Sequence, residues 1–323
     1  MNRRDALRTI LRIGGAGAAL AAGFGVARSL DHFALPGRQG RLTSATKLGM
    51  GTVVTVSAVD PSSSRAEDAL AAAFAELDRL TPLLTRFDPA APLAVLNSQG
   101  RLDAPPACLV AVLDEAHRAH QATSRAFDPT VLPLLAYVEA ECAAGREPDL
   151  REISARRDLV GLDRVSWSAR KVGFTRAGMA LTLDGVAKGF IVDAMAAALR
   201  GAGVRHGLVD AGGDIAAFGG KAQGTPWTVA VRDPENPEAV RERIELTDGA
   251  CTTSGDYEVY FDPQRRHHHI LDPATGASPH LAHSATVVAD TAARADALST
   301  ALLVLGPEGR DLIERQARQA ILG

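Results

Sequence analysis

The segment Leu181-Thr182-Leu183-Asp184-Gly185-Val186-Ala187-Lys188-Gly189-Phe190-Ile191-Val192-Asp193 decides the expected fold. Leu181 and Leu183 predict a short buried strand that ends at an Asp-Gly turn. Small and hydrophobic residues then continue as a helix, which Gly201 and Gly203 end. We expect unpaired N–H groups at the helix start to attract phosphate, with Lys188 adding a positive charge beside them. An ordinary strand–turn–helix with a surface lysine is the alternative.

The composition is typical of a folded chain with a large core. Its 323 residues are 46% hydrophobic and 23% charged, which suits one large domain or two lobes that share a sheet. The net charge is −3 and aromatic residues make up 4%, so we expect no nucleic-acid partner. Cys108, Cys142 and Cys251 are widely spaced and form neither a zinc pattern nor a disulfide framework.

Five further segments share small or polar residues at expected turns and helix starts. They are Met50-Gly51-Thr52, Ala126-Phe127-Asp128-Pro129-Thr130, Asp210-Ala211-Gly212-Gly213-Asp214-Ile215, His269-Ile270-Leu271-Asp272-Pro273-Ala274-Thr275-Gly276 and Asp296-Ala297-Leu298-Ser299-Thr300. In this order, with the segment around Lys188, they closely resemble the ApbE family of flavin transferases. Each motif alone is weak, but six in order are specific.

The resemblance implies both a fold and a reaction. The implied fold is α+β (mixed α/β), two-lobed, with a strand-rich core and flanking helices, and its domain occupies residues 46–323. The implied reaction moves FMN from FAD, the substrate, onto a threonine or serine of an acceptor protein. Family acceptors are extracytoplasmic electron-transfer proteins. An FAD-binding carrier and a Mg²⁺-dependent FAD pyrophosphatase that gives FMN and AMP are the alternatives.

Residues 1–30 resemble a twin-arginine export signal. Arg3-Arg4 precede a weakly hydrophobic run, rich in glycine and alanine, from Ile13 to a candidate cleavage site near Ala27. About 15 apolar residues are short for a membrane span. We expect a periplasmic protein, and we expect membrane association only through this segment or through the acceptor. An uncleaved anchor or a disordered arm is the alternative, and polar residues 31–45 predict a linker.

The resemblance also assigns the residues that bind the flavin nucleotide: Met50, Phe87, Ala126, Phe127, Asp128, Asp184, Lys188 and Ile270. Phe87 stands where the family commonly has tyrosine, so ring stacking is kept and a hydroxyl is lost. Thr182 stands where many relatives have an acidic residue, and Asp184 is the candidate replacement. From the residues alone, Asp128 could instead cap a helix that begins at Pro129, and Met50 could be a core methionine at a strand start.

Asp296 and Thr300 are the candidate ligands of Mg²⁺. Residues four apart on a helix share a face, so this pair presents a carboxylate and a hydroxyl together, as Mg²⁺ prefers. By resemblance, the main-chain oxygen of Gly185 is the third ligand that the protein supplies to the Mg²⁺. A helix N-cap is the alternative for Asp296, but it leaves the paired threonine unexplained.

His269 is the candidate general base. An imidazole that titrates near neutrality suits removal of a proton from an acceptor hydroxyl. Its neighbours His267 and His268 do not suggest a metal site, because adjacent side chains on an extended chain point to opposite faces. Asp272 could assist as a base or only hold the loop. Lys188 is expected to offset charge on the pyrophosphate during transfer.

Overall fold

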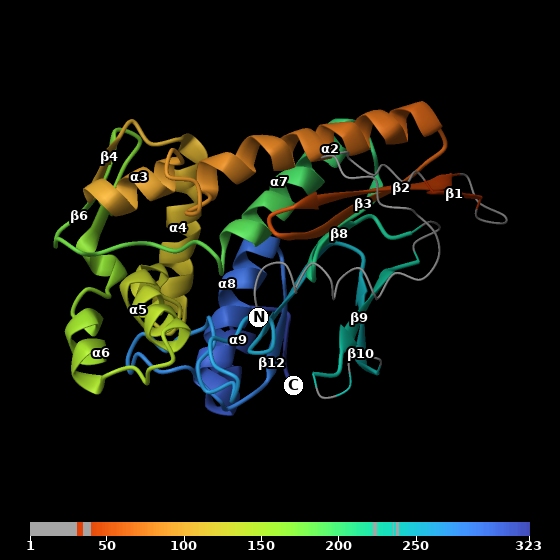
Figure 1. The fold of residues 1–323 in the computed structure, drawn as a ribbon. Coiled ribbons are helices and arrows are strands. Elements are labelled where there is room, and N and C mark those ends of the chain that lie inside the picture. The colour runs from red at the N-terminus through yellow and green to blue at the C-terminus, as the bar shows by residue number, and fades with distance from the viewer. Residues whose placement is uncertain (1–30, 35–39, 222–224, 235, 237–238) are drawn as a thin grey trace.

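An eight-stranded sheet forms the core of the larger of two lobes in this computed structural model (Figure 1). The structure describes residues 31–34, 40–221, 225–234, 236 and 239–323. All neighbouring strands are antiparallel, in the order β1-β2-β3-β7-β8-β11-β12-β13. Their bounds are β1 Asp31–Ala34, β2 Arg41–Gly49, β3 Thr52–Asp60, β7 His206–Ala211, β8 Asp214–Phe218, β11 Gly249–Gly255, β12 Ser284–Ala289 and β13 Gln319–Leu322.

The central strands are buried on both faces of the sheet. Every residue of β8 and β12 is buried, and β12 is rich in the β-branched residues that favour strands. A two-stranded sheet of β9 (Trp227–Arg232) and β10 (Val240–Leu246) covers one face through a separate apolar cluster. Helices cover the opposite face.

Three helices form that cover: α2 (Ser63–Leu84), α7 (Ala187–Gly201) and α8 (Ala292–Leu305). The apolar side of α2 packs against α7 and the sheet, because its buried residues recur at helical spacing. The side chain of Ser62 caps α2 by accepting a hydrogen bond from the Arg65 N–H. α7 packs against α8, so the phosphate segment and the candidate metal helix share an interface.

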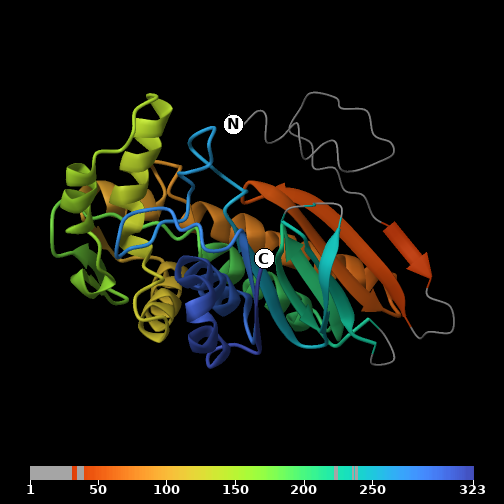
Figure 2. The same cartoon turned by 90° about the horizontal axis from the view of Figure 1, so that it is seen from below.

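The smaller lobe lies beside the main sheet in both views (Figures 1 and 2). It contains a three-stranded sheet in the order β4-β6-β5 and short helices around it. Its elements are α3 Pro92–Gln99, β4 Arg101–Asp103, α4 Ala107–Ala122, η1 Pro129–Val131, α5 Leu132–Ala143, α6 Leu150–Arg157, η2 Leu162–Arg164, β5 Val165–Trp167 and β6 Lys171–Phe174; η3 Gly306–Gly309 and α9 Arg310–Glu314 follow α8. The mixed α+β, two-lobed fold expected from the sequence is confirmed.

Two local predictions were wrong. Residues 31–45 were expected to be a linker, but residues 31–34 and 41–49 form strands β1 and β2. The polar residues of β2 mislead because much of that strand is only half-buried, so its sequence resembles a loop. Leu181–Leu183 were expected to be a strand, but they belong to no strand or sheet.

The expected export signal, residues 1–30, lies outside the described residues. Within the part of the chain that the structure describes, no helix combines the length and the apolar character needed to cross a bilayer.

Candidate active site

Side chains from the smaller lobe hold the segment before α7 in place. The amide of Asn97 donates to the carbonyl of Leu181 at 2.8 Å, and its oxygen accepts from the N–H of Leu181 at 2.7 Å. The N–H of Thr182 donates to the carbonyl of Pro129 at 2.8 Å. One amide side chain therefore takes the place of a neighbouring strand, which explains why apolar residues here form no sheet.

Lys188 lies in the first turn of α7, as the sequence predicts. Its Nζ is 2.5 Å from Oδ2 of Asp214, a carboxylate that is 1% exposed at the start of β8. Burial alone would lower the pKa of Lys188, but the carboxylates of Asp214 and Asp296 outweigh it and raise the pKa. The ammonium is therefore a permanent positive charge at this end of α7.

Asp296, Thr300 and Gly185 lie together, as the proposed metal site requires. Asp296 is 3% exposed, and its Oδ2 accepts the N–H of Gly189 at 3.1 Å. A Cβ placed on Gly185 would lie 2.8 Å from Oγ1 of Thr300, so the Gly185 main chain packs directly against that hydroxyl. Thr291, rather than Asp296, caps α8, which removes the alternative of an N-cap role for Asp296.

These residues fit a hard divalent cation. Burial, reinforced by the charge of Asp214, raises the pKa of Asp296 well above its usual range. Two buried carboxylates share one lysine, so a bound cation would offset the remaining negative charge. Among the described residues no three His, Cys, Asp or Glu side chains gather around one metal position. A cation here would therefore depend on the Thr300 hydroxyl and a Gly185 carbonyl besides Asp296, a set that suits Mg²⁺.

His269 lies close enough to Lys188 and Asp184 for their charges to act on it. Its Nδ1 is 3.1 Å from the carbonyl of Val259; this bond places the proton on Nδ1 and leaves Nε2 as an acceptor. The sequence argument assumed titration near neutrality. Burial instead lowers the pKa of His269 to about 4, so the ring is neutral at physiological pH.

The residues that follow His269 have structural contacts. Oδ1 of Asp272 accepts the N–H of Ala274, and Oδ2 accepts the Thr275 hydroxyl, both at 2.8 Å. This geometry supports the expectation that Asp272 holds the loop and leaves the carboxylate little capacity to act as a base. Ile270 is 7% exposed and belongs to the main apolar core.

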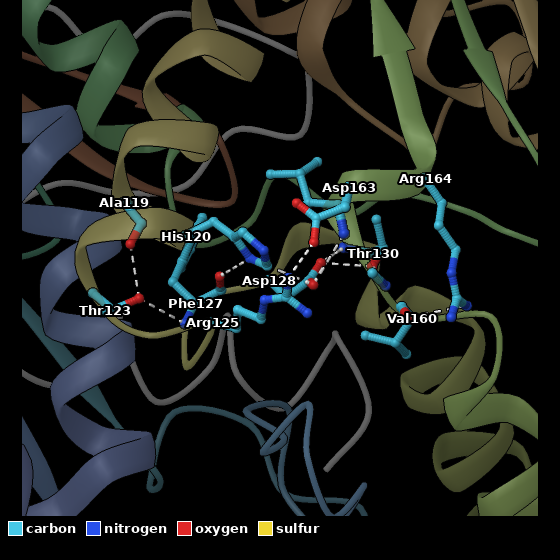
Figure 3. A network of polar contacts seen from close by, with 12 residues as sticks. Ala119, His120, Thr123, Arg125, Phe127, Asp128, Thr130, Val160, Asp163 and Arg164 are labelled. Atoms are coloured by element: carbon cyan, nitrogen blue, oxygen red, sulfur yellow. Dashed lines mark hydrogen bonds and ion pairs between the residues drawn. The ribbon is translucent and has the colours of Figure 1, made fainter.

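Asp128 is the centre of a buried polar network (Figure 3). Its Oδ1 accepts from the N–H of Thr130 at 2.9 Å and from the Thr130 hydroxyl at 2.5 Å, while Oδ2 accepts from the N–H of Leu162 at 3.2 Å. The carboxylate caps η1, whose first residue is Pro129. This is the capping alternative drawn from the sequence. Because Asp128 is only 6% exposed, a contact of this residue with the ribose would have to be made by its main chain.

Ala126 and Phe127, which precede Asp128, are also buried. A Cβ placed on Gly185 would lie 3.2 Å from the Phe127 ring, so this segment borders the candidate metal site. The assigned nucleotide segment and the assigned metal residues are thus brought together by the fold, although they lie far apart in sequence.

Met50 lies in a turn rather than at a strand start. Met50 and Gly51 have φ of 52° and 78° and join β2 to β3, with Gly49 paired to Thr52. Two positive φ values are typical of the tight turn that matches strand twist, although a methionine there is unusual. A Cβ on Gly212 would meet Oγ1 of Thr52 at 2.2 Å, so this hairpin tip packs on the turn that leads to Asp214.

Three aromatic or apolar residues in the segments that contact Asp184 and His269 are exposed. We call Phe87, Tyr257 and Val259 the rim; they are 64%, 36% and 49% exposed. Arg86 lies 4.2 Å from the ring centroid of Phe87, and its Nη2 is 3.0 Å from Oδ2 of Asp184. Asp184, assigned to the nucleotide, is therefore held by an arginine from a distant part of the chain.

Sequence reasoning assigned no role to Arg86, Asn97 or Asp214. Asp214 stands inside a quoted motif, directly after Gly212-Gly213, and its position was the one available signal. Arg86 and Asn97 act on residues 98 and 84 positions away, so local patterns do not reveal them.

Comparisons with known proteins identify the family and the fold. A sequence model of the ApbE family matches residues 50–322. The FAD:protein FMN transferase of Haemophilus influenzae is 35% identical over 208 residues, which span 61% of this chain and 60% of that protein. The flavinyl transferase ApbE of Pseudomonas stutzeri in its apo form superposes with a TM-score of 0.75 at 30% identity, covering 87% of this chain and 90% of that one.

A further solved structure, the ApbE protein of Thermotoga maritima, superposes with a TM-score of 0.77 at 27% identity and covers 87% of this chain and 94% of that one. The family model and the superpositions therefore agree with the family and fold expected from the sequence. The chain belongs to the ApbE family.

Proposed function

We propose that this protein is an FAD:protein FMN transferase that uses Mg²⁺ and modifies a threonine or serine of an acceptor protein. One observation carries the proposal. The start of α7, with Gly185 and Lys188, lies beside Asp296 and Thr300 of α8, although these two pairs of residues are far apart in sequence. The half-buried Lys188 ammonium and several oxygen donors in one place suit a substrate with a charged pyrophosphate. The names of the relatives support the same activity.

Each residue has a role in the proposed reaction. Nε2 of His269 accepts the proton of the acceptor hydroxyl, whose oxygen forms a phosphoester bond to the FMN phosphorus. The bond between that phosphorus and the bridging oxygen breaks, and AMP leaves with the electron pair. Lys188 offsets negative charge on the pyrophosphate oxygens as it builds. Asp296, Thr300 and the Gly185 carbonyl would hold Mg²⁺, which supplies Lewis-acid stabilisation of that charge.

The neutral state of His269 is compatible with this role. With a pKa of about 4 the free ring is a weak base, but it is unprotonated at neutral pH and hence able to accept. Ser254 adds a further hydroxyl, since its Oγ lies 2.8 Å from Oγ of Ser299 and 3.3 Å from Oγ1 of Thr300. We propose that the three neighbouring hydroxyls of Ser254, Ser299 and Thr300 help to orient the phosphate or the incoming peptide.

We also propose that the acceptor is an extracytoplasmic electron-transfer protein and that this chain is exported to the periplasm. The support is the Arg3-Arg4 sequence followed by a short, weakly hydrophobic run in residues 1–30. Mass spectrometry of the periplasmic protein would test export by showing whether the first residues have been removed.

Incubation of the purified protein with FAD, Mg²⁺ and a threonine-containing acceptor tests the reaction. Covalent, acid-stable flavin on the acceptor with release of AMP is the expected result. AMP without labelled acceptor would instead indicate a pyrophosphatase, and neither product would indicate a carrier. Either of these results, obtained with an acceptor that another member of the family does label, contradicts the proposed transferase activity.

A further inference from the structure

The segment from Gly185 through α7 is joined to α8 by three contacts, at intervals of about one helical turn. At the first, Gly185 packs against Thr300; at the second, Oδ2 of Asp296 accepts the N–H of Gly189 at 3.1 Å. At the third, the carboxylate of Asp193 accepts two N–H groups from the start of α8. Each step adds four residues along the first segment and removes four along the second, so the pairing is antiparallel.

The third contact uses both oxygens of Asp193. Oδ1 accepts from the N–H of Ala292 at 2.8 Å, and Oδ2 accepts from the N–H of Ala293 at 2.9 Å. Burial raises the pKa of Asp193 to about 6, so the group is mostly ionised at neutral pH and can accept both bonds. The third N–H of α8, that of Arg294, is bound by the Thr291 hydroxyl at 3.3 Å.

The arrangement is reciprocal. The start of α7 is bound by Asp296, which belongs to the second turn of α8, and the start of α8 is bound by Asp193, which belongs to the second turn of α7. The positive ends of both helices thus each face a carboxylate of the other. The two backbones approach so closely that a Cβ on Gly189 would lie 2.2 Å from the carbonyl oxygen of Ala292. No side chain fits between them, and the register is fixed by hydrogen bonds.

We propose that Asp193 is a positioning residue for the cation site: by fixing the start of α8 against α7, it sets the register that brings Gly185 against Thr300. The inference rests on the proposed function for the identity of the cation. Asp193 itself lies two helical turns from that site, roughly 11 Å along an ideal helix, and both of its carboxylate oxygens bind main-chain N–H groups of α8. It acts through α8, as residues outside the ligand set do in other metal sites.

The chain offers a matched control for this idea. Thr291→Ala removes one hydrogen bond at the start of α8, but that bond lies within α8 and does not link it to α7. Asp193→Asn keeps one acceptor oxygen and turns an NH₂ group towards the second N–H, so it weakens the link between the helices. Asp193→Glu keeps the charge but is one methylene longer, and provides a second variant if the amide does not fold.

The direct test is calorimetric titration of the FAD-free, full-length protein with Mg²⁺, alongside AMP release as a function of Mg²⁺. We expect Asp193→Asn to weaken Mg²⁺ binding by about tenfold or more, as for other residues outside a ligand set, and Asp193→Glu to weaken it less. Thr291→Ala should bind as the wild type does. Unchanged Mg²⁺ binding in Asp193→Asn, or equal weakening in Thr291→Ala, would overturn the positioning role.

Hydrogen exchange on the wild-type protein tests the same coupling without any variant. If the register and the cation site are linked, Mg²⁺ must stabilise the contact as much as the contact favours Mg²⁺. The amides of Ala292 and Ala293 should therefore exchange more slowly when Mg²⁺ is added, and no change would contradict the proposal. A wild-type protein that binds Mg²⁺ but yields no labelled acceptor would remove the proposed function and leave this inference standing.

Discussion

The paired helices α7 and α8 and the exposed rim differ in how their side chains are held. On the helices, Asp296 is 3% exposed and hydrogen-bonded across the helix interface, and Asp214 beside them is 1% exposed. On the rim, Phe87 is 64% exposed and Val259 is 49% exposed. The comparison teaches that the residues proposed to bind the cation and the phosphate are already fixed by the fold, whereas the rim residues keep surface exposed that is available to the proposed acceptor.

The largest effect is expected on the helix side. Asp296→Ala should lower Mg²⁺-dependent AMP release by about a thousandfold or more, because it removes the one carboxylate proposed to hold the cation. Chromatographic measurement of AMP checks this. Asp296→Asn is the control, since it keeps an oxygen for the Gly189 N–H but not the charge, and it should be nearly as inactive. Activity close to that of the wild type in either variant would contradict the proposed role of Asp296 and remove the difference between the helices and the rim.

The next effect falls on His269, between the helices and the rim. His269→Gln should slow labelling of the acceptor by about 10²- to 10⁴-fold, the usual contribution of a general base, while the KM for FAD stays close to that of the wild type. Flavin fluorescence of the acceptor after denaturing electrophoresis gives the rate. Labelling at the wild-type rate would exclude His269 as the base.

The pH dependence of stability tests whether burial lowers the pKa of His269. Its folded pKa of about 4 is below the ordinary value of 6.5. Between these values the unfolded chain binds more protons than the folded chain, so stability falls as the pH is lowered. Urea unfolding at pH 7 and pH 5 should show a larger loss in the wild type than in His269→Gln. Equal losses would mean that the ring is not buried as described.

The smallest effect is expected on the rim. Phe87→Tyr restores the hydroxyl that the family commonly has, but at an exposed ring. We expect the KM for FAD to change by at most about fivefold, since the net contribution of one such hydrogen bond is about 1 kcal/mol. Steady-state kinetics at saturating Mg²⁺ provide the value. A tenfold change would show that the rim is as ordered around the nucleotide as the helices are.

The same contrast separates what the sequence could predict from what it could not. The i, i+4 spacing of Asp296 and Thr300 and the small residues before α7 are local patterns, and the structure places both as expected. Asp193 was part of the opening segment but received no role, because its partners Ala292 and Ala293 lie about a hundred residues away. Contacts made by main-chain groups leave no sequence pattern.

The errors have related causes. Leu181 and Leu183 carry the hydrophobicity of a strand, but the Asn97 side chain binds the main chain that a neighbouring strand would have bound. The pKa of His269 depends on burial that only the tertiary structure produces. Met50 was placed at a strand start, although the adjacent Gly51 could have indicated the tight turn in which it lies.

The central claim is that one cation binds where Asp296, Thr300 and Gly185 meet, with the pyrophosphate beside Lys188. Anomalous X-ray scattering from crystals soaked with Mn²⁺ in place of Mg²⁺ and with FAD tests it most directly. The account predicts a manganese peak bounded by the Asp296 carboxylate, the Thr300 hydroxyl and the Gly185 carbonyl, with phosphate density next to Lys188. A peak at any other place, or phosphate density remote from Lys188, would contradict it.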